Sequence, residues 1–342
     1  MFMKNKIGIW LVVLLSCCLL LVACGERSQE SVTKTLEDSI ASMKGFKAKA
    51  EMIMNTGQEE QTYEVDIWHK KSDFYRVELN SAHAEHGSQI ILKNEDGVFV
   101  LTPALNKNFK FQTEWPDNSS QPYLYQSLVN DITRDDEATF EVTDNHYIFR
   151  TKTNYQNSHH LPSQEIYFDK KSMAPVLVKV LDTDQNASVE VRFTHFELDP
   201  SFQENDFLVE ENLALESKET MSHEASEADV DPFEVLFPLY TAGAELDERK
   251  EVALDDGERI IMTFSGENHF TLIQEKFDTV PTLSFPKEIQ GDIVNLGFTL
   301  GALSDHTLQW SYNGVEFYLA SEDLSRDELI AVAQSVQGQE VK

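Results

Sequence analysis

The sequence predicts a mainly β protein of the α+β class, with about eleven strands before Pro200 and a smaller α+β domain after them. Three observations lead to this prediction. Apolar and polar residues alternate over most of the chain from Phe46 to Leu198, as in strands with two different faces. Only two early segments have apolar residues at helical spacing. A stretch of different composition, 216–232, then precedes a second series of strands. Antiparallel strands that follow one another can curl into one large sheet.

The elements before Pro200 follow from these periods. Helices are predicted over 28–44, with Gly45 as the C-cap, and over 123–134. The alternative for the first helix is a tether that is periodic by chance. The predicted strands are 46–55, 63–68, 75–79, 89–93, 98–102, a weaker one at 105–112, 138–143, 147–153, 164–168, 175–181 and 188–198.

The second half has a core pattern of its own. Residues 216–232 include six acidic residues and one basic residue among 17, with no aromatic residue. We interpret them as an acidic linker between domains 24–215 and 233–342, with a long surface loop as the alternative. Strands are predicted at 258–264, 270–276, 293–300, 306–312 and 315–320, and a helix at 326–335. Asn313-Gly314 predicts a tight hairpin turn, and Ser325 with Glu328 forms a capping box for the helix.

The chain opens with a segment typical of an exported protein. Lys4 and Lys6 precede an apolar run over 7–22, and small residues then lead to Cys24. This is the order of a signal peptide, which we assign to residues 1–23. The apolar run is shorter than the roughly 20 residues of a spanning helix. A plain transmembrane anchor with a chance cysteine is the alternative.

The segment Leu21-Val22-Ala23-Cys24 resembles the lipobox of bacterial lipoproteins. The resemblance implies that Cys24 receives a diacylglycerol and becomes the mature N-terminus. A protein with two acyl chains on one residue is stably held at a membrane. We therefore expect a membrane partner through lipidated Cys24 and a location on the outer face of the cytoplasmic membrane.

Charge and cysteine content exclude several classes of function. The net charge of −31 repels nucleic acid and anionic surfaces, so nucleic acid is excluded as a partner. Cys17 and Cys18 leave with the signal peptide, and Cys24 is expected to be lipidated. No thiol then remains for a disulfide, a redox pair, a cysteine nucleophile or a thiolate metal site.

Short matches along the first domain resemble the lipoprotein-carrier superfamily, which includes LolA and LolB. The matches are Asp73-Phe74-Tyr75-Arg76-Val77, Gln89-Ile90-Ile91, Asp96-Gly97-Val98, Pro175-Val176-Leu177-Val178, Val191-Arg192-Phe193, Phe202 and Phe207. They cover roughly 29–215. The resemblance implies a half-open antiparallel β-barrel whose concave side is covered by helices and holds acyl chains.

The lipobox and the extra C-terminal domain make the whole chain similar to Gram-positive sporulation lipoproteins of the YdcC type and their germination relative GerS. The last 50 residues, from Gly297-Phe298 onward, resemble the C-terminal domain of such proteins. The layout is also similar to periplasmic sensors of the MucB and RseB kind. These resemblances imply a role in sporulation or germination.

A candidate hydrophobic pocket follows from the carrier resemblance. Its expected lining is Ala48, Ala50, Met52, Tyr63, Val65, Ile67, Leu124 and Leu128. Methionine suits an adaptable apolar pocket. The alternative is that these side chains only pack against the two predicted helices.

The sequence carries no recognisable catalytic or metal-binding motif. His83 and His86 lack the spacing of a zinc protease, and His159-His160 lies in a predicted loop. The sequence has no Gly-x-Ser-x-Gly and no phosphate-binding glycine loop. We therefore predict no catalytic residue, no metal and no cofactor. Trp310, Phe317 and Tyr318 form either an aromatic binding face or part of a core.

The sequence therefore predicts a membrane-anchored, non-catalytic module that binds a lipid, a lipidated protein or a hydrophobic protein segment. The second hypothesis is a protein-docking or regulatory module with a dry, packed interior. A cell-wall hydrolase is a third hypothesis, against which the lack of a conventional motif argues.

Overall fold

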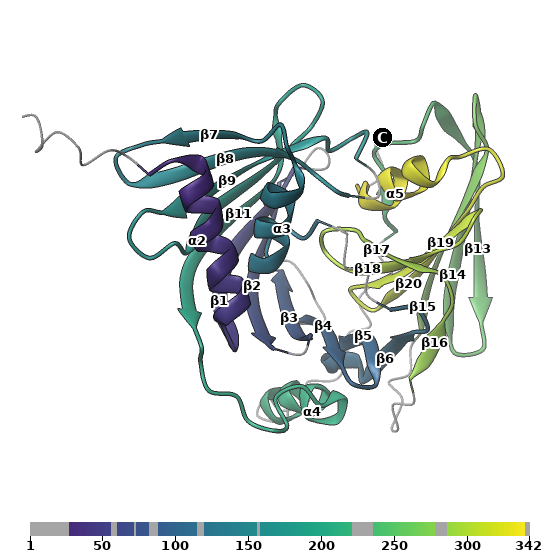
Figure 1. The fold of residues 1–342 in the computed structure, drawn as a ribbon. Helices are drawn as coiled ribbons and strands as arrows, with labels where there is room; N and C mark the ends of the chain where they lie inside the picture. Colours follow the sequence, from purple (N-terminus) through teal and green to yellow (C-terminus); the bar gives the residue numbers. More distant parts are fainter. Residues whose placement is uncertain are drawn as a thin grey trace, which may run out of the picture.

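The computed structural model describes residues 27–55, 60–71, 73–81, 88–114, 120–155, 158–220, 235–277 and 286–338. The signal peptide, Cys24, His83, His86 and residues 221–232 of the predicted linker lie outside the described residues. Within them, two large sheets dominate and confirm the predicted mainly β class (Figure 1).

The first sheet has twelve strands in the order β16-β6-β5-β4-β3-β2-β1-β11-β10-β9-β8-β7. Its strands are β1 (Gly45–Met54), β2 (Gln61–Lys70), β3 (Phe74–Ser81), β4 (Gln89–Asn94), β5 (Gly97–Thr102), β6 (Lys107–Phe111), β7 (Thr139–Val142), β8 (His146–Lys152), β9 (Ser163–Asp169), β10 (Pro175–Leu181), β11 (Ala187–Leu198) and β16 (Lys287–Ile289). The first eleven are antiparallel, as predicted, and β16 pairs in parallel with β6. The second half of the chain thus supplies one edge strand of the first sheet.

Helices cover both faces of this sheet. Helices α2 (Gln29–Ser42) and α3 (Tyr125–Arg134) lie side by side on its concave side (Figure 1). Ser28 caps α2 through a bond from the backbone N–H of Ser31. The predicted C-cap at Gly45 is wrong: α2 ends at Ser42, and Gly45 begins β1, where a Cβ would lie 2.2 Å from the His69 carbonyl oxygen.

Helix α4 (Val209–Thr220) covers the opposite face. It packs over a separate apolar cluster of Ile90, Leu92, Phe99, Leu101 and Phe207. The four of these residues that lie in β4 and β5 alternate with neighbours that face the main core, so both sides of the two strands are apolar and buried. Helix α4 has no counterpart among the elements predicted from the sequence, and its last residues fall within the predicted linker.

The second sheet has seven strands in the order β13-β14-β15-β20-β19-β18-β17. Its strands are β13 (Ala244–Leu254), β14 (Gly257–Gly266), β15 (Phe270–Phe277), β17 (Asp292–Asn295), β18 (Leu300–Leu303), β19 (Thr307–Tyr312) and β20 (Val315–Ala320). A separate two-stranded sheet of β12 (Phe237–Pro238) and β21 (Val336–Gly338), and helix α5 (Arg326–Gln334), complete the second half of the chain. The predicted capping box of Ser325 and Glu328 is present at α5. In the first half of the chain, the short 3-10 helix η1 (Pro103–Leu105) precedes β6.

One predicted strand of the second sheet, 293–300, is wrong as a single element. The chain turns between β17 and β18, where the Leu296 backbone N–H donates to the Thr299 carbonyl oxygen over 3.0 Å. Gly297 has φ +91° there, which an L-residue rarely adopts. The apolar run hides this turn because the turn itself is buried.

The two sheets share one core. A single cluster of buried apolar side chains includes Val32 of α2, Ile67 of β2, Leu300 of β18 and Leu329 of α5. The division into domains at 216–232 stays a prediction. The structure adds that the two sheets pack on each other through apolar side chains.

Candidate functional site

The eight residues predicted to line a pocket all lie in the main core. Their exposed fractions are between 0 and 5 % for Ala48, Ala50, Met52, Tyr63, Val65, Ile67, Leu124 and Leu128. They point from β1, β2 and the start of α3 toward the concave side, where other side chains of the protein surround them. The concave face is therefore packed against the protein itself at these eight positions.

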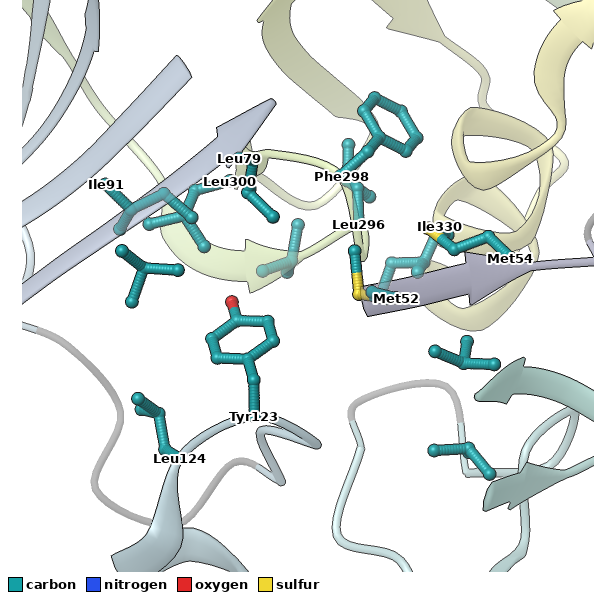
Figure 2. Close-up of a cluster of buried hydrophobic side chains, with 14 of the residues drawn as sticks. Met52, Met54, Leu79, Ile91, Tyr123, Leu124, Leu296, Phe298, Leu300 and Ile330 are labelled. Carbon is teal, nitrogen blue, oxygen red and sulfur yellow. The ribbon is translucent and has the colours of Figure 1, made fainter. Parts of the chain in front are cut away.

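Part of that packing comes from the second sheet. Figure 2 shows Leu296 of the β17–β18 turn close to Met52 and Met54 of β1, and Leu300 at the start of β18 beside Leu79 of β3. A Cβ built on Gly297 would lie 2.5 Å from Cε of Met54. The turn thus rests directly on β1, which explains why a glycine stands at its tightest point.

Polar groups bridge the same junction. The hydroxyl groups of Tyr63 and Tyr312 lie 3.2 Å apart, and Gln89 Nε2 donates to the Ser311 carbonyl oxygen over 2.9 Å. Asn295 Nδ2 donates to Gln121 Oε1. Burial first, and then the neighbouring Tyr312, raise the pKa of the Tyr63 hydroxyl. The hydroxyl therefore stays protonated and can keep donating.

An ion-pair group closes the lower rim of the junction, beside β6 and β16. Glu316 of β20 lies 3.7 Å from Lys107 Nζ and also pairs with Lys287. Burial lowers the pKa of Lys107, although Glu316 opposes the effect. Because the two lysines belong to the first sheet and Glu316 to the second, the group joins the sheets electrostatically.

At the upper rim the junction opens into a cavity of about 250 Å³. The first sheet supplies its walls from the ends of β1 and β11 (Met54, Asn55, Ser188, Val189) and from Asp182 at the β10–β11 turn. The loops around α3 and β9 add Pro122, Tyr155, His160 and Leu161.

The second half of the chain supplies the opposite wall. Tyr240, Asn295, Gly297 and the last turn of α5 with Ala331, Gln334 and Ser335 form it. The rings of His160 and Tyr240 meet edge to face, with their centroids 5.6 Å apart. None of the eight predicted pocket residues lines this cavity, and Met54 is the sequence neighbour that comes nearest to doing so.

A buried carboxylate holds one wall of the cavity in position. Asp131 of α3 is 5 % exposed, and its Oδ2 accepts bonds from Ser120 Oγ over 2.8 Å and Gln164 Nε2 over 2.7 Å. Burial raises the pKa of Asp131 to about 6, against the lowering effect of these two bonds. Ser120 begins the short segment that carries Gln121 and Pro122 to the junction, so Asp131 fixes the position of one cavity wall.

The remaining candidates from the sequence are also placed. His159 Nε2 lies 3.8 Å from Asp327 Oδ2 at the surface. Trp310 and Phe317 stack with centroids 4.9 Å apart and are 3 % exposed, so both belong to the core. Among the residues that the structure describes, no three His, Cys, Asp or Glu side chains are grouped as metal ligands.

The sequence offered little signal for the cavity. Its walls come from segments that are far apart in the chain, and no local pattern connects them. The sequence around His160 indicates only a loop. Asn55 and Asp182 are polar residues that follow strands, as many turn residues do.

The fold and the site define a two-sheet, mainly β protein with a cavity where the sheets meet. The chain belongs to the YdcC-like sporulation protein family, whose model matches residues 4–207. It is 46 % identical over 325 residues to the sporulation protein YdcC of Bacillus subtilis strain 168, covering 95 % of each chain.

Solved structures show lower similarity. The Pseudomonas aeruginosa MucA/MucB complex contains a chain that is 12 % identical, with a TM-score of 0.32 and coverage of 91 % of this chain and 99 % of that one. A LolA superfamily protein from Nitrosomonas europaea is 11 % identical, with a TM-score of 0.29 and coverage of 54 % and 100 %. No helix in the described part of the chain has the length and hydropathy needed to cross a membrane.

Proposed function

We propose that this protein is an extracytoplasmic lipoprotein that acts in sporulation as a non-catalytic docking module for a protein partner. Its family and its relative named as a sporulation protein support the process. The packed concave face is the observation that carries the docking function. Side chains of α2, α3 and the β17–β18 turn take the place that acyl chains would need.

A lipid or hydrophobic ligand is the second candidate, because the inter-sheet cavity has largely apolar walls. Native mass spectrometry of the Cys24→Ser chain, purified from its own host without the signal peptide, separates the two candidates. We expect the mass of the bare chain. Ala331→Phe fills the cavity, and Ala253→Phe, at an exposed position on β13, is the control. If acyl species co-purify with the chain and with the control but not with Ala331→Phe, lipid binding replaces docking as the proposed function.

The membrane anchor has a test of its own. We expect the wild-type chain in the membrane fraction and Cys24→Ser, exported with a signal peptide that is cleaved without lipidation, in the soluble fraction, because loss of two acyl chains removes the hydrophobic anchoring energy. Cys17→Ser is the matched control and stays with the membrane. Membrane association of Cys24→Ser after cell lysis and a high-salt wash would contradict lipidation at this residue.

A further inference from the structure

The groups around the inter-sheet cavity give it a negative electrostatic potential. Among the described residues that line it there is no lysine or arginine, whereas Asp182 brings a carboxylate to its edge. Asp182 Oδ1 accepts bonds from the backbone N–H groups of Asp184 over 2.9 Å and Asn186 over 2.8 Å. These bonds hold the carboxylate in place without a counter-ion, since no described cation forms an ion pair with it.

The C-terminal end of α5 adds to this polarity. Ala331, Gln334 and Ser335 form one wall, and no basic residue stands in the last turn of the helix. The C-terminus of a helix carries about half a negative charge from its aligned peptide dipoles. Glu328, one turn earlier, lies close enough to Tyr240 on this wall to add to the effect of burial in raising the pKa of Tyr240. His160, on the facing wall, in turn adds to the hydrogen bonds that lower the pKa of Glu328. The carboxylates and the C-terminal end of the helix dipole therefore all contribute negative potential to the cavity.

The walls between these charges are aromatic and aliphatic. Tyr155, Tyr240 and His160 offer ring faces or edges, and Met54, Leu161 and Val189 offer aliphatic surface. Aromatic faces attract cations. A long basic side chain has the matching parts, because it carries an apolar stem and a cationic end.

The volume limits the size of the occupant. A cavity of about 150 Å³ takes benzene, and sites for drug-sized ligands start at about 300 Å³. The cavity of about 250 Å³ lies between these values. It accommodates one large side chain better than a lipid with two acyl chains.

We propose that this cavity receives an arginine side chain of the protein partner, with its stem against Met54 and Val189 and its guanidinium facing Asp182 and the C-terminal end of α5. The inference rests on the proposed docking function and specifies its anchor. Arginine is enriched among the residues that dominate protein interfaces. The net charge of −31 favours approach of a basic partner.

The charge of the cavity can be measured with a single thiol. In the Cys24→Ser chain without its signal peptide, Ala331→Cys places the only cysteine in the cavity wall. Thr133→Cys, exposed on α3, is the control. We compare labelling rates of two methanethiosulfonate reagents, one carrying trimethylammonium and one carrying sulfonate. The cation-to-anion rate ratio should be about tenfold higher in the cavity than at the control.

Two further measurements complete the test. Asp182→Asn keeps the acceptor of the turn but removes the charge, so the ratio should fall by about threefold. Asp184→Asn, an exposed residue of the same turn, should leave it unchanged. N-acetylarginine amide should slow labelling in the cavity, and neutral N-acetylcitrulline amide at equal concentration should not.

The outcomes separate this inference from the docking function. An equal or higher rate for the sulfonate reagent, or equal protection by the citrulline compound, would overturn the arginine anchor and leave docking untouched. If neither reagent reaches the thiol of Ala331→Cys while both label Thr133→Cys, and Ser188→Cys on the opposite wall is equally inert, the cavity is closed. A docking site at this place would then be wrong as well.

Discussion

Gly297→Ala should lower the free energy of unfolding by about 1–4 kcal/mol. The backbone contributes about 1–3 kcal/mol, because Gly297 has φ +91° and other residues are strained there. Overpacking adds a smaller amount, since the new Cβ would lie 2.5 Å from Cε of Met54, the flexible end of a side chain that is 1 % exposed and must shift to make room. Urea denaturation followed by circular dichroism measures the loss.

A glycine elsewhere separates these two contributions. Gly97 also has positive φ, +134°, but a Cβ there would meet no atom closer than 3.4 Å. Gly97→Ala should therefore show the backbone cost alone. If Gly297→Ala destabilises the protein no more than Gly97→Ala does, the β17–β18 turn does not rest on β1, and the sheets are joined less tightly than the structure shows.

Asp131→Asn should stabilise the protein at pH 7.5, and by about 2–3 kcal/mol more there than at pH 4. Burial raises the pKa of Asp131 to about 6 from its ordinary 3.8. A carboxyl whose pKa is raised in the folded state stabilises the fold below its unfolded pKa. That contribution is lost as the pH rises through the folded pKa, here between about 4 and 6. A shift of about two pKa units corresponds to about 3 kcal/mol.

Asparagine fits the site in other respects. Its side-chain oxygen can accept the bonds from Ser120 and Gln164, and Gln164 Oε1 is a buried acceptor without a partner among the described residues. The measurement is the difference in unfolding free energy between variant and wild type at pH 4, 5, 6 and 7.5. A difference that does not change with pH would mean that Asp131 is not the group that titrates.

Asp135, at the end of the same helix, provides a control of opposite sign. Partial burial raises its pKa, but bonds from the backbone N–H groups of Lys152 and Glu137 and from the Thr151 hydroxyl lower it by more. Its contribution to stability is therefore lost as the pH falls. Asp135→Asn should accordingly cost stability near neutral pH and little at low pH, the reverse of Asp131→Asn.

The strands of the first sheet were predictable because their pattern is local. Side chains on a strand alternate between two faces, and from β1 to β11 one face is more buried than the other along most strands. The same holds for α5, where Ser325 and Glu328 satisfy backbone groups within one turn. Such signals need no knowledge of distant residues.

Two elements, β13 and α4, could not be predicted because their residues show no local pattern of burial. Strand β13 has exposed, charged residues on both faces, so it shows no alternation, and its pairing with β14 alone makes it a strand. Helix α4 lies on the outer face of β4 and β5, and Asn212 of this helix accepts a bond from the buried Arg76 of β3 over 2.6 Å. Only the folded sheet offers that partner.

The sequence by itself determined the mainly β class, the two helices of the concave side and the overall charge of the protein. The tertiary structure alone decided that the second sheet packs into the open side of the first and that a cavity lies at their upper rim. The physical reason is that burial against a distant sheet and burial against a local helix produce the same apolar pattern. The walls of the cavity, from Asn55 to Ser335, become neighbours only through the packing of the two sheets.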